Sequence, residues 1–110
     1  MTKLTDKTGA PVQIARAGHT FTVEVEGEGV GLARFVEHDD HRVFVHTEVE
    51  PAFKGRGLAT MLIARALAAT RADGRRIVAL CPMVAAYLKK HHDFDDIVDR
   101  PTRQIVDSLR

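Results

Sequence analysis

The sequence is short of several residue types, and each shortage argues against a class of protein. Cys81 is the single cysteine, so an internal disulfide is impossible and a reducing, cytoplasmic setting is favoured. Tryptophan is absent and aromatic residues make up only 5% of the chain, which disfavours a nucleic-acid-binding module. No apolar run is long enough to span a bilayer, and the polar N-terminus is not expected to be a secretory signal.

The remaining composition is typical of one small globular domain. Hydrophobic residues make up 45% of the chain, charged residues make up 28%, and the formal net charge is +1. A chain of 110 residues has room for one modest core, so residues 1–110 are expected to form a single domain. Residues 1–10 are polar and lack a period, which predicts a loose tail. The balanced charge favours neither a nucleic-acid nor a membrane partner.

Apolar and polar residues alternate in the first half of the chain, which predicts strands. We expect an antiparallel meander of three strands, the first starting at Phe21, the second covering 30–36 and the third covering 42–49. Turn residues at 27–29 and 37–41 separate them. The third strand is predicted to place Val43, Val45, Thr47 and Val49 on one face and Phe44, His46 and Glu48 on the other.

The second half predicts helices around one further strand. A helical period runs from Gly57 to about residue 72, and Gly74 suits its left-handed cap. The apolar run 77–80 predicts a central strand, 84–90 a second helix, and the segment near Ile105 a short amphipathic helix. Strands followed by helix, strand and helix indicate an α+β fold.

Glycines stand at alternate positions where the third strand gives way to the first helix. The first turn of a helix has free N–H groups and a partial positive charge, and glycine lets an anion approach the backbone closely. Lys54 and Arg56 flank Gly55 and Gly57 and add positive charge, so a pyrophosphate would fit there. The same residues also suit an ordinary turn with solvated basic side chains, and glycines alone do not separate the two.

The segment from Lys54 to Ala59 resembles the acetyl-CoA motif of the Gcn5-related N-acetyltransferases, [Gln/Arg]-x-x-Gly-x-[Gly/Ala], with lysine at the first position. A longer resemblance, from Phe21 to Val98, is to the small YjdJ-like branch of that superfamily. Its pattern is matched by His46-Thr47-Glu48-Val49-Glu50-Pro51, by Lys54-Gly55-Arg56-Gly57-Leu58-Ala59, by Cys81-Pro82 and by Tyr87-Leu88-Lys89-Lys90-His91. The resemblance implies a minimal fold without the helices that usually cover the acceptor side.

The resemblance also implies a set of site residues. Acetyl-CoA is expected to contact Val49, Lys54, Gly55, Arg56, Gly57, Leu58, Ala59 and Thr60. Cys81 is expected to attack the thioester or to donate a proton to the departing CoA. His46 is expected to act as a base or to polarise Cys81, and Tyr87 to protonate the departing thiolate. From the residues alone, a lone cysteine is more often buried packing, and the histidine and the tyrosine also suit ordinary structural roles.

The function predicted is transfer of acetyl from acetyl-CoA to an amine, either a small molecule or the lysine or N-terminus of a protein. The amine attacks the thioester directly, or an acetyl-Cys81 intermediate divides the reaction into two steps. The alternative is a non-catalytic acyl-CoA-binding or protein-interaction module on the same fold. No metal site is expected, since His38 and His41 better suit a solvated hairpin turn.

Overall fold

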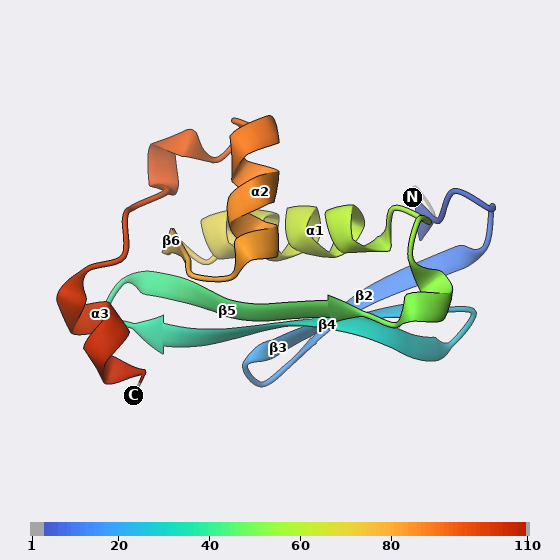
Figure 1. Ribbon diagram of the computed structural model, residues 1–110, viewed down its shortest axis with the longest axis horizontal. Coiled ribbons are helices and arrows are strands. Elements are labelled where there is room, and N and C mark those ends of the chain that lie inside the picture. Colours follow the sequence, from blue (N-terminus) through green and yellow to red (C-terminus); the bar gives the residue numbers. More distant parts are fainter. Residues whose placement is uncertain (1–3, 110) are drawn as a thin grey trace.

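The computed structural model describes residues 4–109, and the strands among them form one sheet in the order β1 to β6 (Figure 1). The strands are β1 Leu4–Thr5, β2 Pro11–Ala17, β3 Thr20–Val25, β4 Glu28–His38, β5 His41–Val49 and β6 Arg76–Ala79. The helices are α1 Leu58–Ala72, α2 Pro82–Lys90 and α3 Arg103–Ser108, with short 3-10 turns η1 Pro51–Phe53 and η2 Asp95–Ile97. Neighbouring strands are antiparallel up to β5, and β6 runs parallel to β5. The meander followed by helix, strand and helix is as predicted.

Helix α1 lies along one face of the sheet, and α2 rises from the sheet beside it (Figure 1). The apolar residues of α1 recur at helical spacing, so Leu58, Leu62 and Leu67 are buried against the strands. Fully burying a leucine side chain stabilises a fold by about 1.5–3 kcal/mol, which fixes the helix on the sheet. Helix α1 ends where Gly74, at φ 72°, donates its N–H to the Arg71 carbonyl, so the predicted glycine cap is confirmed.

A second, smaller core lies on the opposite face of the sheet, under α3. Val43 of β5 and Val78 of β6 pack there against Ile105 of the helix. Thr102 caps α3 by accepting a hydrogen bond from the Ile105 N–H, so the helix expected near the end of the chain is confirmed. Within residues 4–109, no helix combines the length and the hydropathy needed to cross a membrane.

A β-bulge in β5 changes which side chains share a face. The pairing passes from Arg34 with His46 to Phe35 with Phe44, so Val45 is the extra residue. Phe44 packs in the core on the α1 side, whereas Val45 packs on the α3 side. The strict alternation predicted for 42–49 is therefore wrong at this point, because the bulge interrupts the period of two.

The start of the chain differs from the predicted loose tail. Leu4 pairs with Val12, and the Asp6 carboxylate accepts hydrogen bonds from Thr8 and Ala10, so residues 4–10 form a strand and an ordered loop. The strand β2 was also missing from the prediction, and it adds a fourth long strand to the meander. Residues 1–3 of the predicted tail lie outside the described residues.

Candidate functional site

The two strands that frame the site separate halfway along β5. The parallel strand β6 pairs only with the stretch from His41 to Phe44. There the Phe44 carbonyl accepts hydrogen bonds from both Leu80 N–H, at 3.0 Å, and Cys81 N–H, at 2.9 Å, and the chain turns into α2. Strand β5 continues to Val49, so its last residues have no neighbouring strand on that side among residues 4–109.

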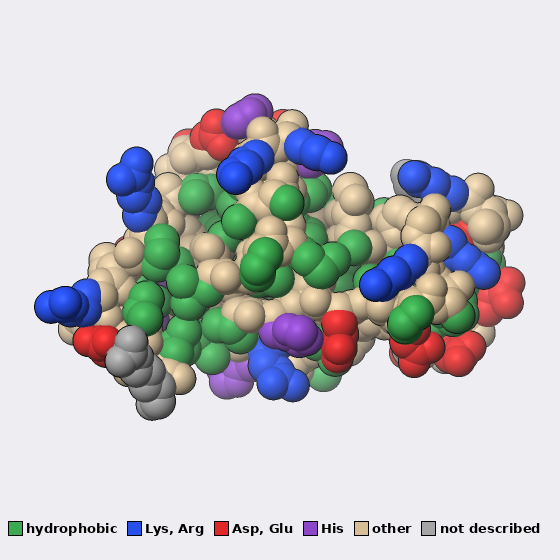
Figure 2. Space-filling model, in the orientation of Figure 1, with side chains coloured by type: hydrophobic (Ala, Val, Ile, Leu, Met, Phe, Trp, Pro, Cys, Tyr) green, Lys and Arg blue, Asp and Glu red, His purple; other side chains and the backbone are tan. Residues whose placement is uncertain are grey.

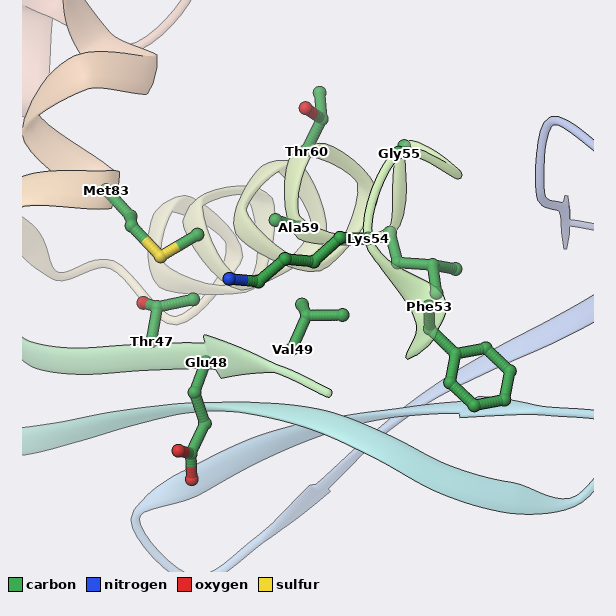
Figure 3. A pocket seen from close by; sticks show the side chains of 11 residues that line it. Thr47, Glu48, Val49, Phe53, Lys54, Gly55, Ala59, Thr60 and Met83 are labelled. Carbon is green, nitrogen blue, oxygen red and sulfur yellow. The ribbon is translucent and has the colours of Figure 1, made fainter. Parts of the chain in front are cut away.

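A pocket of about 420 Å³ lies where β5 has parted from β6. One wall is the end of β5, and the opposite wall is the first turn of α1 with Met83 of α2 (Figure 3). The lining residues are Thr47, Glu48, Val49, Phe53, Lys54, Gly55, Gly57, Leu58, Ala59, Thr60 and Met83. Seven of the eight predicted cofactor-binding residues therefore line one pocket, and Arg56 is the exception.

The glycine turn presents the N-terminus of α1 to this pocket. Gly55 and Gly57 have φ angles of 83° and 80°, a left-handed conformation that favours glycine. The first intrahelical bond runs from Met61 N–H to the Gly57 carbonyl, so the N–H groups of 58–60 have no helical partner. No acidic residue lies in the first turn. The end of α1 is therefore free to bind an anion.

The two basic residues of the turn point in different directions. The Lys54 side chain extends across the pocket toward Met83 and Thr47 (Figure 3). The Arg56 guanidinium lies over the Phe53 ring, 4.6 Å from its centroid, and its Nη1 atom is 3.4 Å from the Asp6 carboxylate. Lys54 is thus the cation of this pocket, and Arg56 faces a separate hollow beside the N-terminal loop.

Cys81 lies directly behind the pocket wall. It is 2% exposed, and its Sγ atom is 3.4 Å from the Thr47 hydroxyl oxygen. Thr47 lines the pocket, whereas Cys81 is absent from the lining. The thiol occupies the N-cap position of α2, where Pro82 begins the helix. A direct reaction at Cys81 therefore requires a movement that exposes the thiol to the pocket.

His46 lies on the other side of the sheet from Cys81. The bulge at Val45 turns His46 to the face opposite α1, where it is mostly exposed. Its Nε2 atom lies 3.6 Å from the Glu48 carboxylate. The structure therefore pairs His46 with Glu48 and Cys81 with Thr47, and it does not bring the two predicted catalytic groups together.

Tyr87 lines a smaller hollow of about 230 Å³ between α1 and α2, which shares Ala59, Thr60 and Met83 with the pocket. The tyrosine ring stacks on the His91 ring with a centroid distance of 4.3 Å. Burial, together with the Asp93 charge, raises the pKa of the Tyr87 phenol. The phenol is therefore protonated at neutral pH and can donate a hydrogen bond or a proton.

A third hollow, of about 510 Å³, lies on the outer face of the sheet at the end of β5. It shares Glu48 and Val49 with the first pocket, and its lining also includes the carboxylates Glu24 and Glu50. Figure 2 shows acidic side chains gathering along this lower side of the molecule. Within residues 4–109, no three His, Cys, Asp or Glu side chains are grouped to hold a metal ion.

Sequence reasoning missed Met83 and gave Thr47 no role, although both line the pocket. Thr47 was part of the matched His-Thr motif, and a threonine on an apolar strand face is a weak signal of a polar contact. Met83 gave no comparable signal, because a methionine after a helix-starting proline is ordinary. Only the meeting of β5 and α2 in space identifies it.

Comparison with known proteins agrees with this geometry. A family model described as GCN5-related N-acetyl-transferase matches residues 20–97. The mycothiol acetyltransferase of Nocardia farcinica is 42% identical over 60 residues, which are 54% of this chain and 20% of that protein. The chain thus spans about a fifth of that relative's length.

The solution structure of a GCN5-like protein from Staphylococcus aureus has a TM-score of 0.64 and 18% identity to this chain, and the match covers 83% of this chain and 91% of that one. This likeness confirms the small α+β fold predicted from the sequence. Since the family model spans more than half of the chain, the protein belongs to the GCN5-related N-acetyltransferase family.

Proposed function

We propose that this protein transfers an acetyl group from acetyl-CoA to an amine. The observation that carries the proposal is the pocket of about 420 Å³ that opens where β5 separates from β6 and ends at the free N-terminus of α1. Such a pocket suits a long ligand with a thioester at one end and phosphates further along. Family membership supports acetyl transfer in general, and the pocket supplies the particular residues.

The residues at the turn fit the diphosphate of CoA. The N–H groups of 58–60 point out of the helix start, and the left-handed glycines keep side chains away from it. The Lys54 ammonium lies across the same pocket and has no carboxylate within 4.0 Å among residues 4–109. We therefore assign the diphosphate to Gly55, Gly57 and the first turn of α1, with Lys54 as its counter-ion.

The edge of β5 fits the thioester arm. Among residues 4–109, the backbone groups on the free side of β5, beyond Phe44, have no strand to bond with, so they are available to the amide groups of the arm. We assign stabilisation of the carbonyl oxygen to backbone N–H donors near Val49. Met83 faces this edge across the pocket and supplies an apolar wall.

The acceptor is proposed to be cationic and to enter from the outer face of the sheet. The hollow there adjoins the thioester end through Glu48 and Val49, and it has carboxylates on both sides. These carboxylates attract an ammonium group and repel anionic acceptors. His46 and Glu48 lie on the same side, so this pair is placed to take the proton that the ammonium must lose.

The transfer is proposed to be direct. The neutral amine nitrogen forms a bond to the thioester carbon, the carbon–sulfur bond breaks, the nitrogen gives up its extra proton to water, and the departing thiolate takes up a proton. Tyr87 is the proposed donor, because its phenol is protonated and its hollow shares Met83 with the pocket; the phenolate then regains a proton from solvent. An acetyl-Cys81 route is less favoured, since the thiol is buried behind Thr47 and His46 is on the other face.

A thiol-release assay with acetyl-CoA tests the proposal against a panel of monoamines, polyamines, lysine peptides and carboxylated amines. Turnover is expected with cationic amines and not with anionic ones. Tight CoA binding without turnover on any amine favours the alternative, a non-catalytic acyl-CoA-binding module. Intact mass of the protein after exposure to acetyl-CoA alone distinguishes the two chemical routes, because only the cysteine route leaves an acetyl group on the protein.

A further inference from the structure

A separate hollow of about 370 Å³ lies on the far side of the glycine turn from β5. Its lining is Thr5, Asp6, Lys7, Arg56, Gly57, Thr60 and Met61. It shares Gly57 and Thr60 with the cofactor pocket and shares no residue of β5. The glycine turn at the start of α1 is therefore flanked by this hollow and by the cofactor pocket, and each contains one lysine.

The N-terminal loop is held against the turn by specific bonds. Lys7 N–H donates to the Arg56 carbonyl at 3.1 Å. The Asp6 carboxylate accepts from Thr8 N–H at 2.8 Å, from the Thr8 hydroxyl at 2.6 Å and from Ala10 N–H at 3.0 Å. The Thr8 hydroxyl first, and then these N–H groups and Arg56, lower the pKa of Asp6. Lys7 is thus fixed at its backbone beside the turn.

The Lys7 side chain crosses the face of Gly57. A Cβ atom built on Gly57 would lie 3.4 Å from Lys7 Cε and 3.7 Å from Lys7 Cγ. The Lys7 ammonium has no carboxylate within 4.0 Å among the residues described. Asp6 is occupied by loop donors and Arg56, so the hollow keeps an excess of positive charge.

We propose, resting on the function proposed above, that this hollow binds the 3′-phosphate of the CoA ribose and that Lys7 is its main ligand. The diphosphate and the 3′-phosphate are separate anions joined by one ribose. If the diphosphate occupies the turn at Gly57, the next anion along the molecule lies within reach of a group bordering that same turn. Lys7 meets this condition and has no carboxylate partner within 4.0 Å in the described part of the chain, and Arg56 adds a second cation.

The hollow between α1 and α2 is the other place that the 3′-phosphate could reach from the glycine turn. Its cation is Lys90, in the last turn of α2. That hollow borders the turn only through Thr60 and Ala59, and its lining is largely apolar or aromatic. Such a lining suits a dianion poorly. Lys90 therefore supplies the competing assignment that an experiment must separate from Lys7.

The test compares affinity for CoA with affinity for dephospho-CoA, which lacks only the 3′-phosphate, by titration calorimetry at low salt. The variants are Lys7→Gln, Lys90→Gln and the control Lys89→Gln, an exposed lysine that lines none of these hollows. The wild-type protein is expected to prefer CoA by about tenfold, as for one charge-assisted contact at a surface. Lys7→Gln is expected to remove most of that preference while affinity for dephospho-CoA stays within about twofold, because glutamine keeps the stem over Gly57.

Lys90→Gln and Lys89→Gln are expected to keep the preference. Loss of the preference in Lys90→Gln with retention in Lys7→Gln overturns the inference, and so does a wild-type protein that binds both ligands equally. In both of those results CoA still binds, so the proposed function stands. A folded wild-type protein that binds neither ligand overturns the proposed function, and the inference with it. Rising salt should reduce the preference of the wild-type protein and leave Lys7→Gln nearly unchanged.

Discussion

Replacing Gly57 by aspartate places a carboxylate at the point where the diphosphate is proposed to bind. A single charge about 5 Å from a phosphate group, at an effective dielectric of about 20, meets repulsion of about 3 kcal/mol. Exposure to solvent and salt reduces this, so a loss of about 30- to 100-fold in CoA affinity is expected. A new Cβ also meets the flexible Lys7 stem, at 3.4 Å from Cε, which can shift.

The matched control is Gly57→Asn, which has nearly the same shape and carries no charge. Both residues tolerate the left-handed φ of 80° better than other side chains do, at a cost of about 1 kcal/mol. The aspartate also gains from the positive end of α1, by about 0.3–1 kcal/mol, so Gly57→Asp should be at least as stable as Gly57→Asn. Calorimetry with CoA measures the difference between them. Equal affinity of folded Gly57→Asp and Gly57→Asn for CoA would refute the diphosphate assignment.

Three further changes test other parts of the molecule. Cys81→Ala should keep turnover within about fivefold of the wild-type rate and lower the free energy of unfolding by about 1–2 kcal/mol. An acetyl group found on Cys81 of the wild-type protein by mass spectrometry would contradict direct transfer. Glu24→Gln should raise KM for a dicationic amine about threefold at low salt. Glu28 lies outside the hollow on the outer face of the sheet, so Glu28→Gln should leave this KM unchanged. Equal effects of the two variants would contradict the proposal that the acceptor binds in that hollow. Arg76, and then His41, hold the pKa of Asp99 far below its usual range. The ionised Asp99 carboxylate therefore stabilises the fold fully above the pKa that it has in the unfolded chain, and this stabilisation is lost as pH falls through its pKa in the folded protein. Asp99→Asn should lower the melting temperature at neutral pH. It should also make the melting temperature depend less on pH on the acid side.

Much of the fold followed from the sequence because local pattern and final environment agree there. Phe21, Val23 and Val25 alternate and are all buried on one face of β3. Strand β2 was missed because it lies near the sheet edge and buries little. Among its residues only Val12 is fully buried, so its sequence shows hardly any alternation. Its pairing with β3 depends on backbone bonds that composition does not reveal.

Part of the candidate site could likewise be predicted from the sequence, and part could not. The glycine turn was predictable because left-handed φ angles and an open helix start require residues that are visible locally. The direction of the Arg56 side chain could not be predicted, because it depends on Asp6, fifty residues earlier in the chain. The N-terminal loop that holds Asp6 contains no apolar period, so nothing in the sequence indicated that it packs against the turn.

The arrangement of the predicted catalytic residues depends on one extra residue in β5. Without the bulge, strict alternation from Phe44 would place His46 on the α1 side and Thr47 on the outer face. With Val45 inserted, Thr47 faces the pocket and contacts Cys81, while His46 joins Glu48 on the acidic side. The bulge thus separates the proposed thioester side, with Thr47 and the free edge of β5, from the proposed acceptor side with His46 and Glu48. Bulges re-aim side chains next to active sites, and a direct transfer between two substrates bound on opposite sides of β5 needs such a division.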